Sequence, residues 1–335
     1  MTATGIGSLP FEDIDDALRL VLDELPDLPH LPELPGRGVG ADLIGRTAGA
    51  VLVDLHVDLQ PAGWRLVDRR SHDEITAREL LTRDLEALQV QAHGYEGLLK
   101  LQVAGPWTLA ANLELSRGDK VLGDAGAVRD LTASLAEGVR AHLDAVSALV
   151  PEARLMLQLD EPALPMVLAG RVPTASGYRA FAPVDEQPAR EALREVLEHA
   201  AGAVATVVHC CAPQPPIRLL VSAGAGSVSV DASLLTERDD DSIGELVEAG
   251  RGLWLGLVPS LGPGAAPTVA TLAAPARALW SRLGFPAEQL SSAVTVTPTC
   301  GMAGASTGWA RTALGLTRRT ALALADDPEP ARVAR

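Results

Sequence analysis

The sequence predicts an α/β protein, a single-domain (β/α)8 TIM barrel, on three observations. Short apolar runs alternate with longer amphipathic stretches, which indicates repeated βα units around a parallel sheet. Eight such runs fit within 335 residues, a usual size for one barrel. Residues with reactive side chains follow several runs, at the strand ends where barrel active sites lie. We expect the barrel to span residues 1–325, followed by a flexible tail, 326–335, that has little to bury.

Each expected strand is a short run rich in valine and leucine, and each expected helix repeats apolar residues every three to four positions. The eight strands are Thr2–Gly7, Ala50–Leu55, Leu98–Val103, Arg154–Leu159, Ala203–Val208, Gly226–Val230, Gly252–Leu257 and Ala293–Thr297. The helices are Ile14–Leu25, Asp73–Ala92, Ala127–Ala148, Gln187–His199, Ile243–Ala249, Thr271–Arg282 and Trp309–Ala325. Two Pro- and Gly-rich stretches depart from the repeat: Pro26–Gly40 is expected to be an irregular excursion and Pro259–Pro267 a loop.

Composition narrows the class of protein. The formal net charge of −15 argues against nucleic-acid or anionic-membrane partners. Three cysteines in the chain favour a reducing compartment over a disulfide framework, and no secretion signal or membrane-length apolar run is visible, so we expect a cytoplasmic protein. Nearly all basic residues are arginine, and the lysines are Lys100 and Lys120.

The three cysteines stand close to a histidine and to strand ends. His209-Cys210-Cys211 ends one apolar run and Cys300 follows another. Side chains two apart on a strand share a face, so His209 and Cys211 point the same way. Imidazole and thiolate are preferred zinc ligands, and a catalytic zinc takes three protein ligands and one open position. The trio of His209, Cys211 and Cys300 therefore predicts a zinc site; the alternative is that the cysteines are small buried hydrophobes.

Acidic residues end two further strands. Asp231 is a candidate fourth, oxygen ligand that an incoming thiolate displaces, or else a helix cap. Asp160 and Glu161 end the fourth strand, where a carboxylate binds an ammonium group or acts in proton transfer. Because adjacent residues point to opposite faces, one of the pair is expected to serve the site and the other to cap a helix.

Three other features carry less information. Gly5-Ile6-Gly7-Ser8 offers backbone N–H groups and a hydroxyl to a small carboxylate, and lacks the spacing of a nucleotide loop. Pro106-Trp107 begins a helix and is either a pocket wall or core packing. The remaining histidines are isolated, and of them His56 is the one retained as a candidate.

In this order the motifs resemble the catalytic C-terminal barrel of the cobalamin-independent methionine synthase family, which belongs to a superfamily that includes uroporphyrinogen decarboxylase. The resemblance runs from Gly5 to about Arg311. It implies a zinc-dependent methyltransferase. The residues it implies are Gly7, Ser8, Asp160 and Glu161 for homocysteine and His209, Cys211, Asp231 and Cys300 for zinc.

The chain departs from the family pattern at three points. Asp231 stands where glutamate is common, and there is no room for the N-terminal half of the full-length enzymes, so the resemblance is to a stand-alone core form. The family's catalytic histidine has no counterpart in Leu255–Ser260. That histidine assists protonation of the departing folate nitrogen, so the donor is either methyltetrahydrofolate or a methylcorrinoid with a better leaving group.

The expected function is zinc-dependent methyl transfer to the thiol of homocysteine, forming methionine, with Asp160 as the candidate catalytic residue. The activity would resemble that of a 5-methyltetrahydropteroyltriglutamate–homocysteine S-methyltransferase. Expected partners are the thiol, the methyl donor and, as one source of it, a corrinoid or corrinoid protein. The alternatives are alkyl transfer to another small thiol and a non-catalytic zinc-binding relative.

Overall fold

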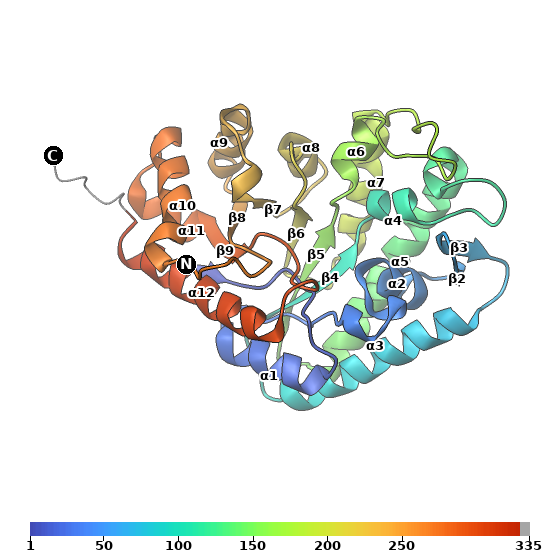
Figure 1. The fold of residues 1–335 in the computed structure, drawn as a ribbon, viewed down its shortest axis with the longest axis horizontal. Coiled ribbons are helices and arrows are strands. Elements are labelled where there is room, and N and C mark those ends of the chain that lie inside the picture. Colours follow the sequence, from blue (N-terminus) through green and yellow to red (C-terminus); the bar gives the residue numbers. More distant parts are fainter. Residues whose placement is uncertain (329–335) are drawn as a thin grey trace.

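The computed structural model describes residues 1–328 and has an α/β fold built on one curled parallel sheet (Figure 1). The sheet has seven strands in the order β1-β9-β8-β7-β6-β5-β4. They are β1 (Thr2–Ala3), β4 (Leu98–Ala104), β5 (Arg154–Asp160), β6 (Ala205–Cys210), β7 (Ser227–Asp231), β8 (Gly252–Val258) and β9 (Val294–Pro298). The predicted α/β class and parallel pairing are confirmed.

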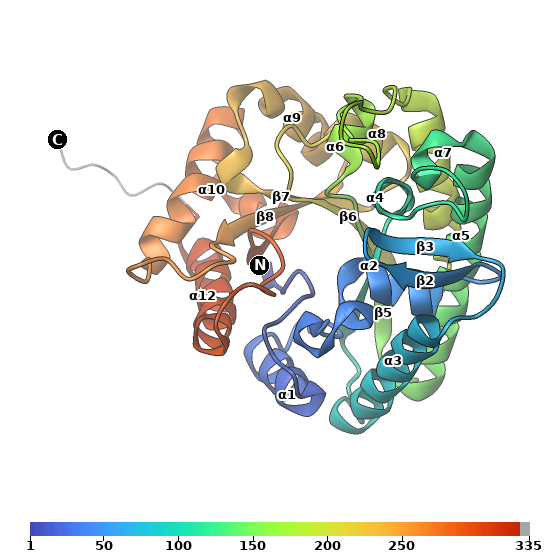
Figure 2. The same cartoon turned by 45° about the vertical axis from the view of Figure 1, so that its right-hand side comes forward.

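Helices surround the sheet on its outer side (Figure 2). The long ones are α1 (Ile14–Glu24), α3 (His72–Gln91), α5 (Ala125–Leu149), α7 (Glu186–His199), α9 (Asp240–Glu248), α10 (Val269–Leu283) and α12 (Thr307–Asp326). The short ones are α2 (Leu43–Arg46), α4 (Pro106–Asn112), α6 (Leu164–Leu168), α8 (Ile217–Ser222) and α11 (Leu290–Ala293). All seven helices expected from the sequence form, because each presents an apolar face to the sheet.

The prediction of a second strand at Ala50–Leu55 is wrong. Residues Thr47–Val51 form a π-helical turn, in which Leu52 N donates to Thr47 O. Val51 and Leu52 of the apolar run are buried at the end of that turn instead of in a sheet, since burial alone does not distinguish the two structures. The chain then forms an antiparallel hairpin that the sequence reading missed, β2 (His56–Gln60) and β3 (Gly63–Val67).

The proline-rich stretch 26–40 is irregular, as expected, but part of it lies between the two edge strands of the sheet. Leu31 N donates to Lys100 O of β4 at 3.0 Å. On the other side, Glu33 makes two backbone bonds of 3.2 and 2.9 Å to the segment after β1. Pro32, like the other prolines here, has no N–H, so the pairing is limited to isolated parallel bridges. This segment takes the position of an eighth strand without forming one.

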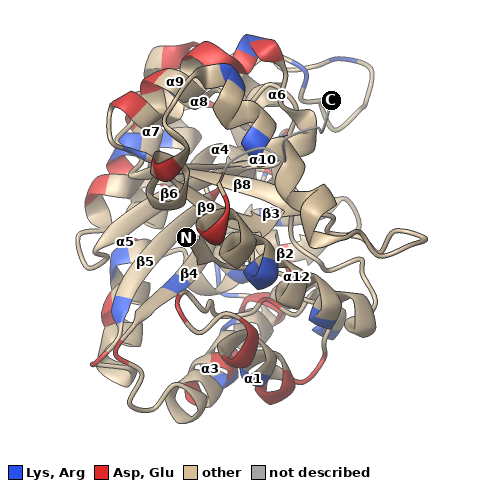
Figure 3. Ribbon diagram, turned by 90° about the vertical axis from the view of Figure 1, so that its left-hand side faces the viewer, with Lys and Arg blue, Asp and Glu red and all other residues tan. Residues whose placement is uncertain are grey.

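Charged residues, blue and red in Figure 3, are found mainly on the helices that surround the sheet. Among residues 1–328, no helix is both long and apolar enough to cross a bilayer. Helix α12 ends at Asp326, the first residue of the predicted tail, and residues 329–335 of that tail lie outside the described part of the chain.

Candidate active site

The predicted site residues stand at the C-terminal ends of β5, β6 and β7 and in the segments that follow β1, β6 and β9. All these strands are parallel, so their C-terminal ends share one edge of the sheet. Residues far apart in the chain therefore meet there.

His209, Cys211 and Cys300 form a cluster in which the ligand atoms all lie within 4.8 Å of one another. His209 is 2% exposed, and its Nε2 has no hydrogen-bond partner within residues 1–328. Its Nδ1 lies 2.9 Å from Ser229 Oγ of β7. A proton held on Nδ1 by this contact leaves the Nε2 lone pair free, which is how imidazole binds a metal.

The two clustered thiols differ from the third. Cys211 Sγ and Cys300 Sγ lie 3.0 Å apart, and the hydrogen bond between them lowers the pKa of Cys300 to about 4 while it raises the pKa of Cys211. One thiol is therefore readily ionised, as a thiolate ligand must be. Cys210 is fully buried in the core, and burial raises its pKa to about 12. The alternation of the strand thus excludes Cys210 from the cluster.

Asp231 lies at the end of β7 and is not one of the three clustered residues. Its Oδ1 accepts hydrogen bonds from Ser233 N at 2.8 Å and from Ser233 Oγ at 2.7 Å. It therefore caps the short 3-10 helix Ala232–Leu234, which was the alternative foreseen for it. A role as a fourth metal ligand stays a prediction.

Asp160 and Glu161 have the divided roles that their opposite faces suggest. Glu161 is fully buried and accepts hydrogen bonds from Trp107 N, Thr108 N and Thr108 Oγ1 at 3.0, 2.8 and 2.8 Å. It therefore caps α4. Burial raises the pKa of Glu161 to about 7, although the hydrogen bonds from Thr108 and Trp107 act to lower it. Asp160 instead accepts a bond of 2.7 Å from Gln158 Nε2, in the barrel interior.

The turn after β1 lies against the segment that carries Cys300. Met302 N donates to Ser8 O at 2.8 Å, which holds the Cys300-Gly301 segment beside the turn. A Cβ at Gly301 would lie 2.5 Å from Ser8 Oγ, so any larger residue there would require the Ser8 side chain to move. The structure thus brings together Ser8 and Cys300, which the sequence separates by almost the whole chain.

A buried polar group next to Asp160 was missed by the sequence reading. It contains Glu33, Lys100, Gln102 and Gln158, all 2% exposed or less. Burial raises the pKa of Asp160 well above its usual value, and nearby Glu33 raises it further. Burial lowers the pKa of Lys100 to about 7, against the attraction of Asp160 and Glu33. The available signal was a lysine and a glutamine inside an otherwise apolar strand run.

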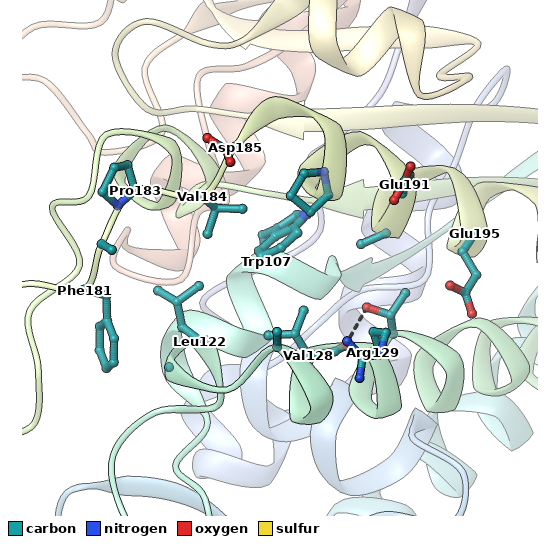
Figure 4. A pocket seen from close by; sticks show the side chains of 16 residues that line it. Trp107, Leu122, Val128, Arg129, Phe181, Pro183, Val184, Asp185, Glu191 and Glu195 are labelled. Carbon is teal, nitrogen blue, oxygen red and sulfur yellow. Dashed lines mark hydrogen bonds between the residues drawn. The ribbon is translucent and has the colours of Figure 1, made fainter.

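Two other predicted candidates lie apart from the cluster. His56 Nδ1 lies 3.0 Å from Glu74 Oε2 on α3, a contact that ties the hairpin to that helix. Trp107 is 3% exposed and donates from Nε1 to Ala189 O at 3.0 Å, which is the core-packing alternative. Trp107 also contacts an apolar groove of about 590 Å³ between α5 and α7 (Figure 4). Apart from Trp107, none of the predicted site residues lines this groove.

A smaller cavity of about 320 Å³ lies at the ends of β7 and β8. It is lined by Asp231, Ala232, Ser233, Gly256, Leu257, Pro259, Ser260, Leu261, Pro275 and Thr299. Thr299 directly precedes Cys300, so the cavity is next to the cluster of His209, Cys211 and Cys300. Asp231 is the one ionisable side chain among these lining residues.

Residues 95–323 match the protein family described as "Cobalamin-independent synthase, Catalytic domain". In structure the chain is similar to a B12-independent methionine synthase from Shewanella sp. W3-18-1 solved with selenomethionine, with a TM-score of 0.61 and 14% identity over 97% of this chain and 98% of that one. It is also similar to GH5_18 from Streptomyces cattleya, with a TM-score of 0.48 and 15% identity over 98% of this chain and 82% of that one. The first likeness concerns the fold alone, and the second is too low to support an argument. Comparison with curated proteins gave no sequence match.

Proposed function

This chain belongs to the family of cobalamin-independent synthase catalytic domains and is a methyltransferase, and from that premise we propose that it methylates the thiol of homocysteine to form methionine. The observation that carries the proposal is the convergence of an unpartnered His209 Nε2 with two thiols beside the Gly7-Ser8 turn.

We propose that His209, Cys211 and Cys300 hold a zinc ion. The donor set suits zinc, since it offers one imidazole nitrogen and two sulfurs and leaves a position for substrate. The contact of His209 Nδ1 with Ser229 supports the ring orientation that such a ligand needs. When bound, zinc keeps a substrate thiol deprotonated near neutral pH. Asp231 is proposed as an oxygen ligand that substrate displaces.

The amino-acid part of the substrate would lie between the turn after β1 and the end of β5. Gly7 and Ser8 offer backbone N–H groups and a hydroxyl to its carboxylate. Asp160 is proposed to hold the ammonium group, with Glu33 as a second carboxylate close enough to raise the Asp160 pKa. A positive ligand between two buried carboxylates relieves their repulsion. Glu161, already bound to α4, is proposed to support this end of β5, and direct contact with substrate is the alternative.

The cavity beside the cluster bears on the methyl donor. Among its lining residues, Leu257 and Ser260 stand where the resembled family has a histidine, and no imidazole replaces it. General acid catalysis of a poor leaving group is therefore not provided from this strand end. We propose a donor whose leaving group departs without protonation there, such as a methylcorrinoid, and keep methyltetrahydrofolate as the alternative.

The test is methionine formation by the zinc-loaded protein from homocysteine, measured with methylcob(III)alamin and with methyltetrahydrofolate as separate donors. Methionine from either donor supports the proposal and identifies the donor class. Transfer to a different small thiol, but not to homocysteine, would favour the second candidate function, because the zinc cluster alone does not define the thiol. Bound zinc without transfer from either donor to any thiol would indicate a non-catalytic relative.

A further inference from the structure

Lys100 lies in the middle of β4 and is fully buried, although it is a lysine in an apolar strand. Its Nζ donates a hydrogen bond of 2.8 Å to Ile6 O and one of 2.7 Å to Gln158 Oε1. Ile6 belongs to the turn proposed to bind the substrate carboxylate. One ammonium group therefore contacts both that turn and β5.

Gln158 extends this contact to the other half of the proposed site. Its Nε2 donates to Ile6 O at 2.9 Å and to Asp160 Oδ1 at 2.7 Å. In its protonated form Lys100 has donors and no acceptor, so its ammonium group binds the oxygen of the Gln158 amide. The Gln158 NH₂ group must then face Asp160. Without Lys100, the amide would be free to turn and to leave Asp160 without this donor.

Lysine is rare in this chain, and its chemistry suits this position better than that of arginine. Lys100 and Lys120 are the only lysines among 28 basic residues, and the rest are arginine. A compact ammonium group can donate to two oxygens in a closed space, whereas a planar guanidinium group has its donors in a fixed fork. A charged group is also costly to bury, so its presence requires compensating contacts. Asp160 and Glu33 supply opposite charge nearby.

We propose that Lys100 is a positioning residue, which aligns the Ile6–Ser8 turn with Asp160 and thereby makes the site selective for thiols that carry an amino-acid group. The inference rests on the proposed function, since it assigns that site its substrate class. Lys100 acts through Ile6 O and Gln158 Oε1, to which its Nζ donates.

The experiment compares two thiols in Lys100→Met and Gln158→Leu, each loaded with zinc. Homocysteine probes the whole site, and 1-propanethiol probes the metal position alone because it has neither amine nor carboxylate. We expect both variants to weaken homocysteine binding about tenfold or more, from the lost hydrogen bonds, with zinc content and 1-propanethiol affinity unchanged. The two losses should not add in the double variant, because the residues form one chain of contacts. Thr317→Val, which removes a buried hydroxyl bonded within α12, is the control for core disruption.

Equal weakening of both thiols in both variants, or unchanged homocysteine binding, would overturn the proposal. Gln158→Leu keeps the test valid if Lys100→Met does not fold. Hydrogen exchange of residues 1–12 gives a readout that needs no substrate: the amides of the Ile6–Ser8 turn should exchange faster in either variant than in Thr317→Val. If the unmodified protein binds no homocysteine, the proposed function fails, and unchanged exchange in that turn would then also refute the role of Lys100.

Discussion

Replacing Ser229 with alanine should weaken zinc binding without removing any zinc ligand. Ser229 is fully buried, and its Oγ lies 2.9 Å from His209 Nδ1. With zinc on Nε2, the ring must keep its proton on Nδ1, and alanine leaves that buried N–H without an acceptor. In the metal-free protein the ring can change tautomer or rotate, so the penalty falls mainly on the bound state.

The magnitude follows from the cost of an unsatisfied buried donor, about 1–3 kcal/mol. That cost corresponds to a zinc dissociation constant raised about fivefold to 150-fold. The range agrees with the loss of about 10- to 100-fold that follows removal of a group that orients a metal ligand.

Competition against a chromophoric zinc chelator at neutral pH measures this dissociation constant directly. Ser227→Ala is the matched control, because Ser227 lies two residues earlier on β7 and so on the same face of the strand. We expect the control to keep the unmodified affinity. A Ser229→Ala protein that binds zinc as tightly as the control would refute the assignment of His209 Nε2 as a ligand.

Three further predictions concern the cluster and its support. Cys211→Ser should lose most bound zinc in elemental analysis whereas Cys210→Ala should keep it, and equal zinc content in the two variants would contradict the ligand set. Burial raises the pKa of Glu161 in the folded protein from 4.5 to about 7, so the stability that its protonated form contributes is full below pH 4.5 and is lost as the pH rises to 7. Glu161→Gln should remove this pH-dependent loss of about 3 kcal/mol. The same dependence of the unfolding free energy on pH in both proteins, measured with urea, would disprove it. Gly105→Ala places a Cβ against the Glu161 carboxylate and should lower the free energy of unfolding in urea by about 1–3 kcal/mol. Gly244→Ala in α9, which has open space around it, should not destabilise the protein. Equal stability of the two variants would show that the contact with Glu161 does not restrict residue 105.

The parts of the fold that depend on local sequence could be predicted. Strands β4 to β9 lie within about two residues of the expected runs, because each is a short apolar stretch between turn signals. The contact of residues 26–40 with both edge strands could not be predicted, since prolines in this stretch argue against a strand and the pairing there is limited to single bridges. The run Ala50–Leu55 misled because an apolar segment can be buried in a helical turn as well as in a strand.

In the site, too, some features follow from local sequence and others depend on contacts between distant segments. The approach of His209 and Cys211 to Cys300 follows from strand alternation and from the shared edge of a parallel sheet. The interior contacts of Lys100 and Glu33 do not, because they join the turn after β1 to β4 and β5 through a curvature that no single segment encodes. Composition shows that a lysine is rare here, but only the structure shows which oxygens it contacts.

Calorimetric titration of homocysteine into zinc-loaded and zinc-stripped protein tests the central claim most directly. The proposed function predicts stoichiometric binding to the zinc-loaded form, with release of the thiol proton, and a large loss of affinity when zinc is removed. Equal binding to both forms, or no binding to the zinc-loaded form, would contradict the proposal that this cluster activates the thiol of homocysteine.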